Sequence, residues 1–153
     1  MIEGKEKIQP VLDFWTFKDV DGLRWNPSNQ AELTVSFRAR SFVYVYNLET
    51  NRRRKIFLNG NKKHNGIGCE CLEFVPKRSN VFVSIDIKGQ TQLLDTRVGR
   101  KPQWSFLQPP RSVQRRRRLC LHESGDLMFC STGNMIAAYD LRRLYVVVVW
   151  CVP

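Results

Sequence analysis

The sequence has few histidines and none of the common catalytic motifs. Only two histidines, His64 and His122, occur among 153 residues, and neither lies near a cysteine or serine in a recognisable nucleophile setting. The phosphate-binding loop G-x-x-x-x-G-K-[ST], the nucleophile elbow G-x-S-x-G and the zinc-binding H-E-x-x-H are all absent. Carboxylates such as Asp86 and Asp126 are scattered, so no acid–base pair can be argued. We therefore expect a protein that is not an enzyme and uses no cofactor.

A long apolar run is also missing. The longest, Tyr145 to Val152, has 8 residues, whereas a helix needs roughly 20 to cross a bilayer. Residues 1–10 are polar and lack the apolar core of a signal peptide. We therefore expect an intracellular protein without a membrane partner, in the nucleus or the cytoplasm, with the nucleus favoured.

The cysteines do not form the even set that is typical of a secreted, disulfide-bonded domain. There are five of them, and Cys69 and Cys71 are separated by a single residue. Paired cysteines in structural zinc sites are usually spaced by about two to four residues. The pattern therefore predicts reduced cysteines within buried strands, and no metal site.

Positive charge is abundant. The formal net charge is +11 and the isoelectric point is near 9.9, which favours anionic partners such as nucleic acid or acidic protein surfaces. Two segments expected to be loops, Asn51 to Asn65 and Pro109 to Arg118, hold the candidate anion-binding residues Arg52, Arg53, Arg54, Arg111, Arg115, Arg116, Arg117 and Arg118. The run of four arginines fits a solvated loop or import signal, a contact with an acidic protein, or nucleic-acid binding.

The chain repeats a pattern three times. The matched positions lie 49 and then 47 residues apart at Trp25, Phe74 and Leu121. The closing tripeptides of the three segments step by 48 and then 45 residues. These lengths slightly exceed the roughly 40–45 residues of one four-stranded propeller blade, and we expect the excess to lie in loops.

Each repeat contains four short stretches that are typical of β-strands, with turn residues between them. The stretch from Phe42 to Tyr46 is apolar or aromatic throughout, which suits a strand buried on both faces. Gly89 and Gly133 lie in two of the expected tight turns, where glycine is able to take a positive φ. No stretch has sustained helical periodicity, so the sequence predicts an all-β fold.

The ends of the third stretches resemble the WD-repeat (WD40) family. Tyr139-Asp140-Leu141-Arg142 is the best match, Leu94-Asp95-Thr96-Arg97 is weaker, and Tyr46-Asn47-Leu48-Glu49 keeps only the aromatic residue. The resemblance covers residues 11–150 and implies a partial β-propeller of about three four-stranded blades, at approximately 18–58, 67–107 and 116–150. Residues 1–10 form a polar N-terminal segment.

The repeats depart from the family pattern in two ways. No Trp-Asp or Gly-His pair opens or closes a repeat, and the expected turn aspartate is replaced by Arg40, Lys88 and Gly133. Three blades are also fewer than the about four to eight that typically close a propeller. We therefore expect divergent repeats held together by packing, in a fragment, a truncated isoform or an assembly that other blades or subunits complete.

The resemblance implies a scaffold that binds proteins. Its closing aromatic-Asp-x-Arg is similar to the motif by which substrate receptors dock on the adaptor of cullin-RING ubiquitin ligases. Two such motifs supply the protein-binding candidates, which are Asp95 with Arg97 and Asp140 with Arg142. These residues also fit ordinary turns after a third strand. The alternative function is a nucleic-acid or chromatin-binding module that acts through the basic segments.

Overall fold

Antiparallel β-sheets make up the chain. A computed structural model describes residues 20–58, 67–98, 102–108, 116–143 and 145–151. The first sheet contains β1 (Val20–Trp25), β2 (Glu32–Phe37), β3 (Phe42–Asn47) and β4 (Arg52–Phe57). The second contains β5 (Cys69–Phe74), β6 (Val81–Asp86), β7 (Gln90–Asp95) and β8 (Trp104–Leu107). The third contains β9 (Arg118–Leu121), β10 (Leu127–Thr132), β11 (Met135–Asp140) and β12 (Tyr145–Cys151).

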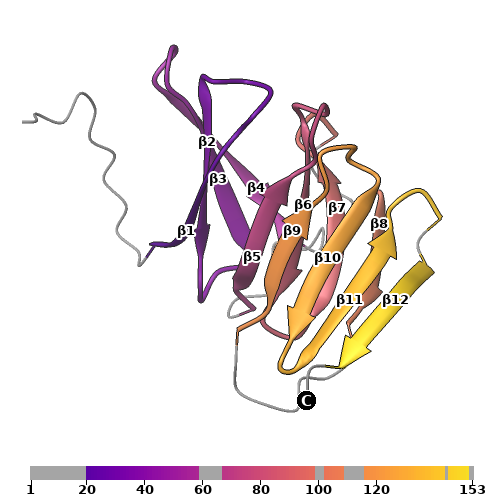
Figure 1. Cartoon of the computed structure of the whole chain (residues 1–153). Helices are drawn as coiled ribbons and strands as arrows, with labels where there is room; N and C mark the ends of the chain where they lie inside the picture. The colour runs from indigo at the N-terminus through magenta and orange to yellow at the C-terminus, as the bar shows by residue number, and fades with distance from the viewer. Residues whose placement is uncertain (1–19, 59–66, 99–101, 109–115, 144, 152–153) are drawn as a thin grey trace, which may run out of the picture.

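The predicted all-β fold is confirmed. Within each sheet the four strands follow one another in chain order, and every neighbouring pair is antiparallel. In the described part of the chain the three sheets do not close into a ring (Figure 1). None of the described ranges contains a helix long and apolar enough to cross a membrane.

The first strands of the sheets lie next to one another, and the sheets pack face to face. Strand β5 contacts both β1 and β9, and Figure 1 shows β9 beside β5. One apolar core joins the first and second sheets and includes Val45, Ile56, Leu72 and Phe82. A second core joins the second and third sheets. Burial of apolar surface between sheets therefore holds the array together.

Turn chemistry fixes where the strands end. Gly89 and Gly133 have φ values of 92° and 63°, the left-handed conformation expected of them. At the turn after β6, one Asp86 carboxylate oxygen accepts hydrogen bonds from the backbone N–H groups of Lys88 and Gln90, both at 2.9 Å. The aspartate that organises this turn is thus two residues before the position where the WD-repeat pattern places it.

The first basic segment is not a loop at its start. Residues Arg52 to Phe57 form β4, an edge strand that pairs with β3. Strand alternation sends Arg54 and Ile56 toward the second sheet, while Arg53 and Lys55 lie on the opposite face. Edge strands commonly carry charged side chains, so a basic composition did not prevent this segment from pairing. Residues 59–65 of the segment lie outside the described ranges.

Candidate protein-binding surface

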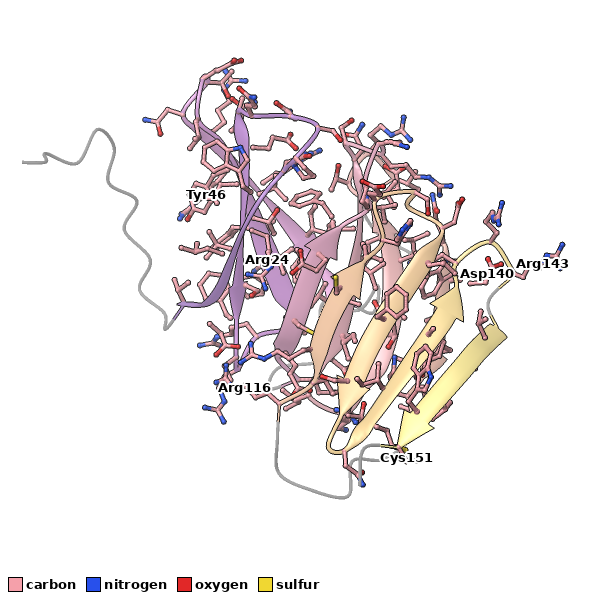
Figure 2. The ribbon with its side chains drawn as sticks, in the orientation of Figure 1. Arg24, Tyr46, Arg116, Asp140, Arg143 and Cys151 are labelled. Carbon is pink, nitrogen blue, oxygen red and sulfur yellow. The ribbon has the colours of Figure 1, made fainter. Side chains whose placement is uncertain are left out.

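The two Asp-x-Arg motifs lie at the same end of the sheets. The third strands β3, β7 and β11 end there, and the turns between first and second strands lie beside them. We call this the closing end, and we define it by residues 26–31, 48–51, 75–80, 96–98, 122–126 and 141–143. Figure 2 shows Asp140 and Arg143 at the closing end, and Arg116 and Cys151 at the opposite end.

A turn built on the last residue of the third strand recurs in all three sheets. The Asp95 Oδ1 accepts a hydrogen bond from the Arg97 N–H (2.9 Å), and the Asp140 Oδ1 accepts one from the Arg142 N–H (2.8 Å). In the first sheet the Asn47 Oδ1 accepts one from the Thr50 N–H (2.8 Å). These are the backbone bonds by which Asp and Asn stabilise turns. The aspartates therefore stabilise the turns.

Arg97 and Arg142 differ in how firmly they are held. Arg97 donates from Nε (3.0 Å) and Nη2 (2.7 Å) to the two carboxylate oxygens of Asp95. The Arg142 Nε lies 3.8 Å from both Asp126 and Asp140, which is too far for a hydrogen bond. The two arginine side chains are 67% and 65% exposed. The structure thus presents Arg97 in a fixed orientation, and Arg142 more loosely.

The pair formed by Asp95 and Arg97 predicts a pH-dependent stability. Hydrogen bonds from the Arg97 side chain hold the pKa of Asp95 below its usual value, which is about 3.9 in an unfolded chain. A lowered folded-state pKa stabilises the fold above the unfolded value, and this contribution is lost as the pH falls through the folded value. Urea denaturation should therefore show a difference between wild type and Asp95→Asn that shrinks as the pH drops below about 4. A difference that stays constant from neutral pH into this range would contradict the charged pair.

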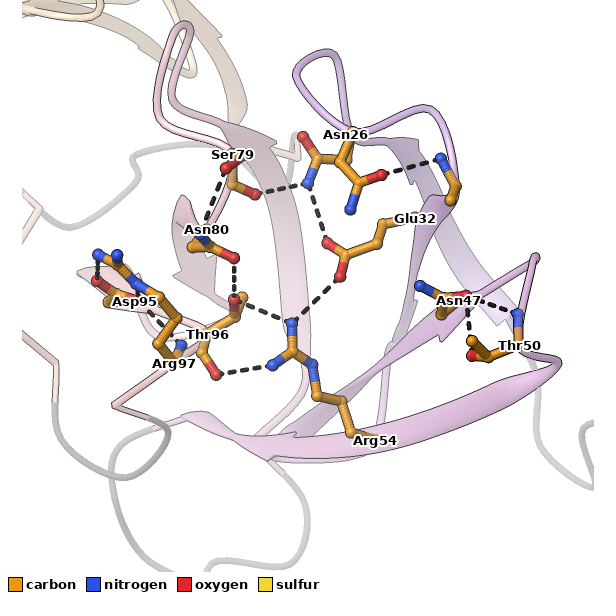
Figure 3. Close-up of polar contacts among 12 residues, drawn as sticks. Asn26, Glu32, Asn47, Thr50, Arg54, Ser79, Asn80, Asp95, Thr96 and Arg97 are labelled. Atoms are coloured by element: carbon orange, nitrogen blue, oxygen red, sulfur yellow. Dashed lines mark hydrogen bonds and ion pairs between the residues drawn. The ribbon is translucent and has the colours of Figure 1, made fainter.

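A partly buried polar network connects the first and second sheets at the closing end (Figure 3). Asn26 Nδ2 donates to Glu32 Oε2 (3.1 Å) and to the Ser79 carbonyl (2.6 Å). Arg54 donates to the Thr96 carbonyl and hydroxyl, both at 3.1 Å, and lies 3.4 Å from Glu32. Hydrogen bonds from the first sheet therefore reach the turn after β5 and the turn after β7. Together they fix the relative position of the two sheets at this end.

The basic residues of β4 are mostly engaged within the protein. Arg54 belongs to the polar network, as described above. The Arg53 guanidinium lies 4.9 Å from the centre of the Tyr44 ring, and Lys55 Nζ lies 3.9 Å from that of Phe42. Such cation–π contacts keep a cation over the sheet while it remains exposed. Arg52 is exposed at the start of the strand.

The arginines of the run that leads into β9 lie in different environments. Arg117 is 2% exposed, and its N–H and Nη1 donate to the two oxygens of Glu70 at 3.0 and 3.1 Å. Arg116 is paired with Asp21 at 3.0 Å and is 43% exposed, while Arg118 is exposed. Burial therefore leaves Arg117 without access to an anion in solution. Arg111 and Arg115 lie outside the described residues.

The cysteines are free thiols in different environments. Cys69 and Cys130 are buried within strands, whereas Cys120 and Cys151 are exposed. Burial raises the pKa of Cys69 to about 12 and that of Cys130 to about 11, and it also raises the pKa of Cys71. These three thiols therefore stay protonated at neutral pH and are poor nucleophiles and metal ligands. Among the described residues, no group of three or more His, Cys, Asp and Glu side chains is placed to hold a metal ion.

Sequence reasoning missed the residues that join the sheets. Glu70, Glu73, Glu32 and Asn26 were not singled out, although the partners of Glu70 and Glu73 lie one repeat length away along the chain. Arg24 Nε is 2.6 Å from Glu73, which is 49 residues later, and Glu70 pairs with Arg117, which is 47 residues later. These are the offsets of the repeat itself. Opposite charges at equivalent positions of successive repeats were the signal that would have revealed them.

The chain has no detected relative among known families. No protein-family model matches it, and no curated protein matches it in sequence. The three sheets are simple antiparallel meanders, an architecture that many protein families share. A function must therefore be argued from the surface at the closing end.

Proposed function

We propose that this chain is a non-enzymatic scaffold of the WD-repeat type that binds protein partners at its closing end. The adaptor of cullin-RING ubiquitin ligases is the most specific partner that the Asp-x-Arg motifs suggest. The observation that carries the proposal is the placement of Arg97, which is exposed yet held in one orientation by Asp95. We place its action inside the cell, in the nucleus or the cytoplasm.

The geometry of Arg97 suits recognition of carboxylates or backbone carbonyls. A guanidinium group has five N–H donors in a planar fork, and Asp95 accepts from only the Nε and Nη2 positions. The donors that remain face outward on a side chain that is 67% exposed. Because the group is already oriented, less side-chain entropy is lost on binding.

Binding to the purified adaptor tests the proposal. Arg97→Ala should weaken binding by about thirtyfold, the effect of losing one hot-spot residue of about 2 kcal/mol. Arg142→Ala should weaken it less, because its guanidinium is not fixed. The matched control is Arg118→Ala, which removes an exposed arginine from the opposite end and should leave the affinity unchanged. Equal affinities for wild type and both closing-end variants would reject adaptor docking.

Nucleic-acid binding through the basic segments has less support. Phosphate binding needs several cations that are free to pair, but Arg117 is buried against Glu70 and Arg54 is bonded to Thr96. Arg116 lies at the opposite end of the sheets from Arg143 (Figure 2), and Arg118 is next to it in the chain, at the start of β9. These two arginines are therefore separated from Arg97 and Arg142 at the closing end. Retention on nucleic acid that falls steeply with salt and depends on Arg118 would favour this alternative.

A further inference from the structure

A polar pocket opens at the closing end of the second sheet. It has a volume of about 360 Å³ and lies between the turn after β5 and the turn after β7. Three cations, Lys77, Arg78 and Arg97, and a single carboxylate, Asp95, line it. The rest of the wall consists of the neutral hydrogen-bonding side chains Ser79, Asn80 and Gln103 and the apolar Val81. Figure 3 shows four of these residues, Ser79, Asn80, Asp95 and Arg97, around the turn.

The pocket carries an excess of positive charge. Asp95 is neutralised by Arg97, which donates three hydrogen bonds to it, two from the side chain and one from the backbone. Lys77 and Arg78 are exposed, and neither forms an ion pair with another described residue. Two unneutralised cations therefore remain, together with the free donors of Arg97. An anionic group of two charges would balance them.

Lys77 occupies a strained backbone conformation. The Arg78 N–H donates to the Val75 carbonyl (3.1 Å), which makes residues 75–78 a tight turn with Pro76 and Lys77 at its centre. Lys77 has a φ of 64°, and this position of a type II turn strongly favours glycine or asparagine.

The strain at Lys77 is not shared by the other sheets. The equivalent turns of the first and third sheets have Ser28 and Ser124 at this position, and neither serine has a positive φ. Among the described residues, Asn51 is the only other non-glycine residue with a positive φ. Strained residues concentrate at functional sites, where a side chain is needed at that place. The strained conformation of Lys77 therefore distinguishes the turn that lines this pocket from the equivalent turns of the other two sheets.

We propose that this pocket binds a phosphorylated serine or threonine side chain within an acidic segment of a protein partner. Lys77, Arg78 and Arg97 donate to the phosphate, and the amide and hydroxyl side chains of the wall supply neutral donors. A phosphate group offers three acceptor oxygens and close to two negative charges at neutral pH. The proposal rests on the closing end being the protein-binding end.

A peptide fits the pocket better than a nucleic acid does. Nucleic-acid backbones present regularly spaced phosphates and are bound along a track of cations. The cations here gather in one concave site, and the exposed Arg116 and Arg118 lie at the other end of the sheets. One compact group of donors matches one phosphate, as in other domains that recognise phosphorylated motifs through clustered cations.

The test uses the full chain and a fluorescent peptide with one phosphoserine flanked by glutamates, measured by anisotropy. The key variant is Lys77→Gly, which removes a cation and also relieves the strained turn. Its melting temperature should equal or exceed that of wild type, while its affinity for the phosphopeptide should fall about tenfold, since one charge-assisted hydrogen bond is lost. Lys88→Gly is the matched control, because it removes a lysine from a turn at the opposite end of the same sheet. It should leave the affinity unchanged.

Several outcomes would overturn the proposal. One is equal affinity of wild type and Lys77→Gly, and another is equal affinity for the phosphorylated and unphosphorylated peptides. Tighter binding of a single-stranded oligonucleotide that also depends on Lys77 would assign the pocket to nucleic acid instead. If adaptor binding still depends on Arg97 while the phosphopeptide does not bind, only the phosphate proposal fails. If Arg97→Ala changes neither adaptor binding nor phosphopeptide binding, the proposed function fails as well.

Discussion

Replacing Glu70 by glutamine should lower the free energy of unfolding by about 3–5 kcal/mol. Glu70 lies on β5, and its two carboxylate oxygens accept from the N–H and Nη1 of Arg117, which directly precedes β9. The two side chains are 4% and 2% exposed, so the pair joins the second and third sheets in a dry environment. Without the carboxylate charge, the Arg117 guanidinium remains buried with no counter-charge, and this is the source of the cost.

The guanidinium group of Arg117 is closely packed against a neighbouring turn. A Cβ at Gly89 would lie 2.7 Å from Arg117 Nη2, so the turn between β6 and β7 packs directly on the guanidinium. A double variant that combines Glu70→Gln with Arg117→Met removes the buried charge, and it should recover most of the lost stability.

A more exposed pair serves as the control for Glu70. Asp21→Asn breaks the pair with Arg116, which is 43% exposed, and should cost no more than about 1 kcal/mol. Urea denaturation with linear extrapolation measures all three variants. If Glu70→Gln cost no more than Asp21→Asn, the pair would not be buried as described.

Replacing Phe82 by alanine should cost a similar amount, about 3–5 kcal/mol. Phe82 is fully buried on β6, within the core that joins the first and second sheets. Its ring meets that of Phe74 with centroids 6.0 Å apart and an angle of 65° between planes, the edge-to-face arrangement. Truncation leaves a cavity that neighbouring strands cannot close without losing their own pairing. The loss is a large share of the about 5–15 kcal/mol that stabilises a typical domain.

Two further variants serve as controls for the loss of stability expected in Phe82→Ala. Phe82→Leu keeps an apolar side chain of intermediate volume in the core, and we expect a clearly smaller loss than for alanine. Leu107→Ala removes a side chain that is 66% exposed, and should change stability by no more than about 0.5 kcal/mol. Thermal or urea denaturation that gave Phe82→Ala the same midpoint as Leu107→Ala would show that the first two sheets do not pack as described.

The strands followed from the sequence because they depend on local patterns. The stretch from Phe42 to Tyr46, predicted to be a strand, lies within β3. Tight turns were predicted at Gly89 and Gly133, and both glycines have a positive φ. Repeat spacing predicted three similar units, and each unit forms one four-stranded sheet.

The side-chain contacts were harder to predict, because they depend on packing between repeats. A run of four arginines indicates one basic patch, yet Arg117 is buried against Glu70 between the exposed Arg116 and Arg118. Alignment of the repeats would have placed Glu70 opposite Arg117. The difference between Arg97 and Arg142 has no such signal, because both follow an aspartate by two residues and only the side-chain conformation separates them.

Hydrogen–deuterium exchange of the full chain with and without the purified ligase adaptor tests most directly whether the closing end binds proteins. We expect slower amide exchange within residues 75–80, 96–98 and 141–143 in the complex. Exchange within the opposite turns, residues 38–41, 87–89 and 133–134, should stay unchanged. Protection confined to those opposite turns, or no change within the closing end, would contradict the account.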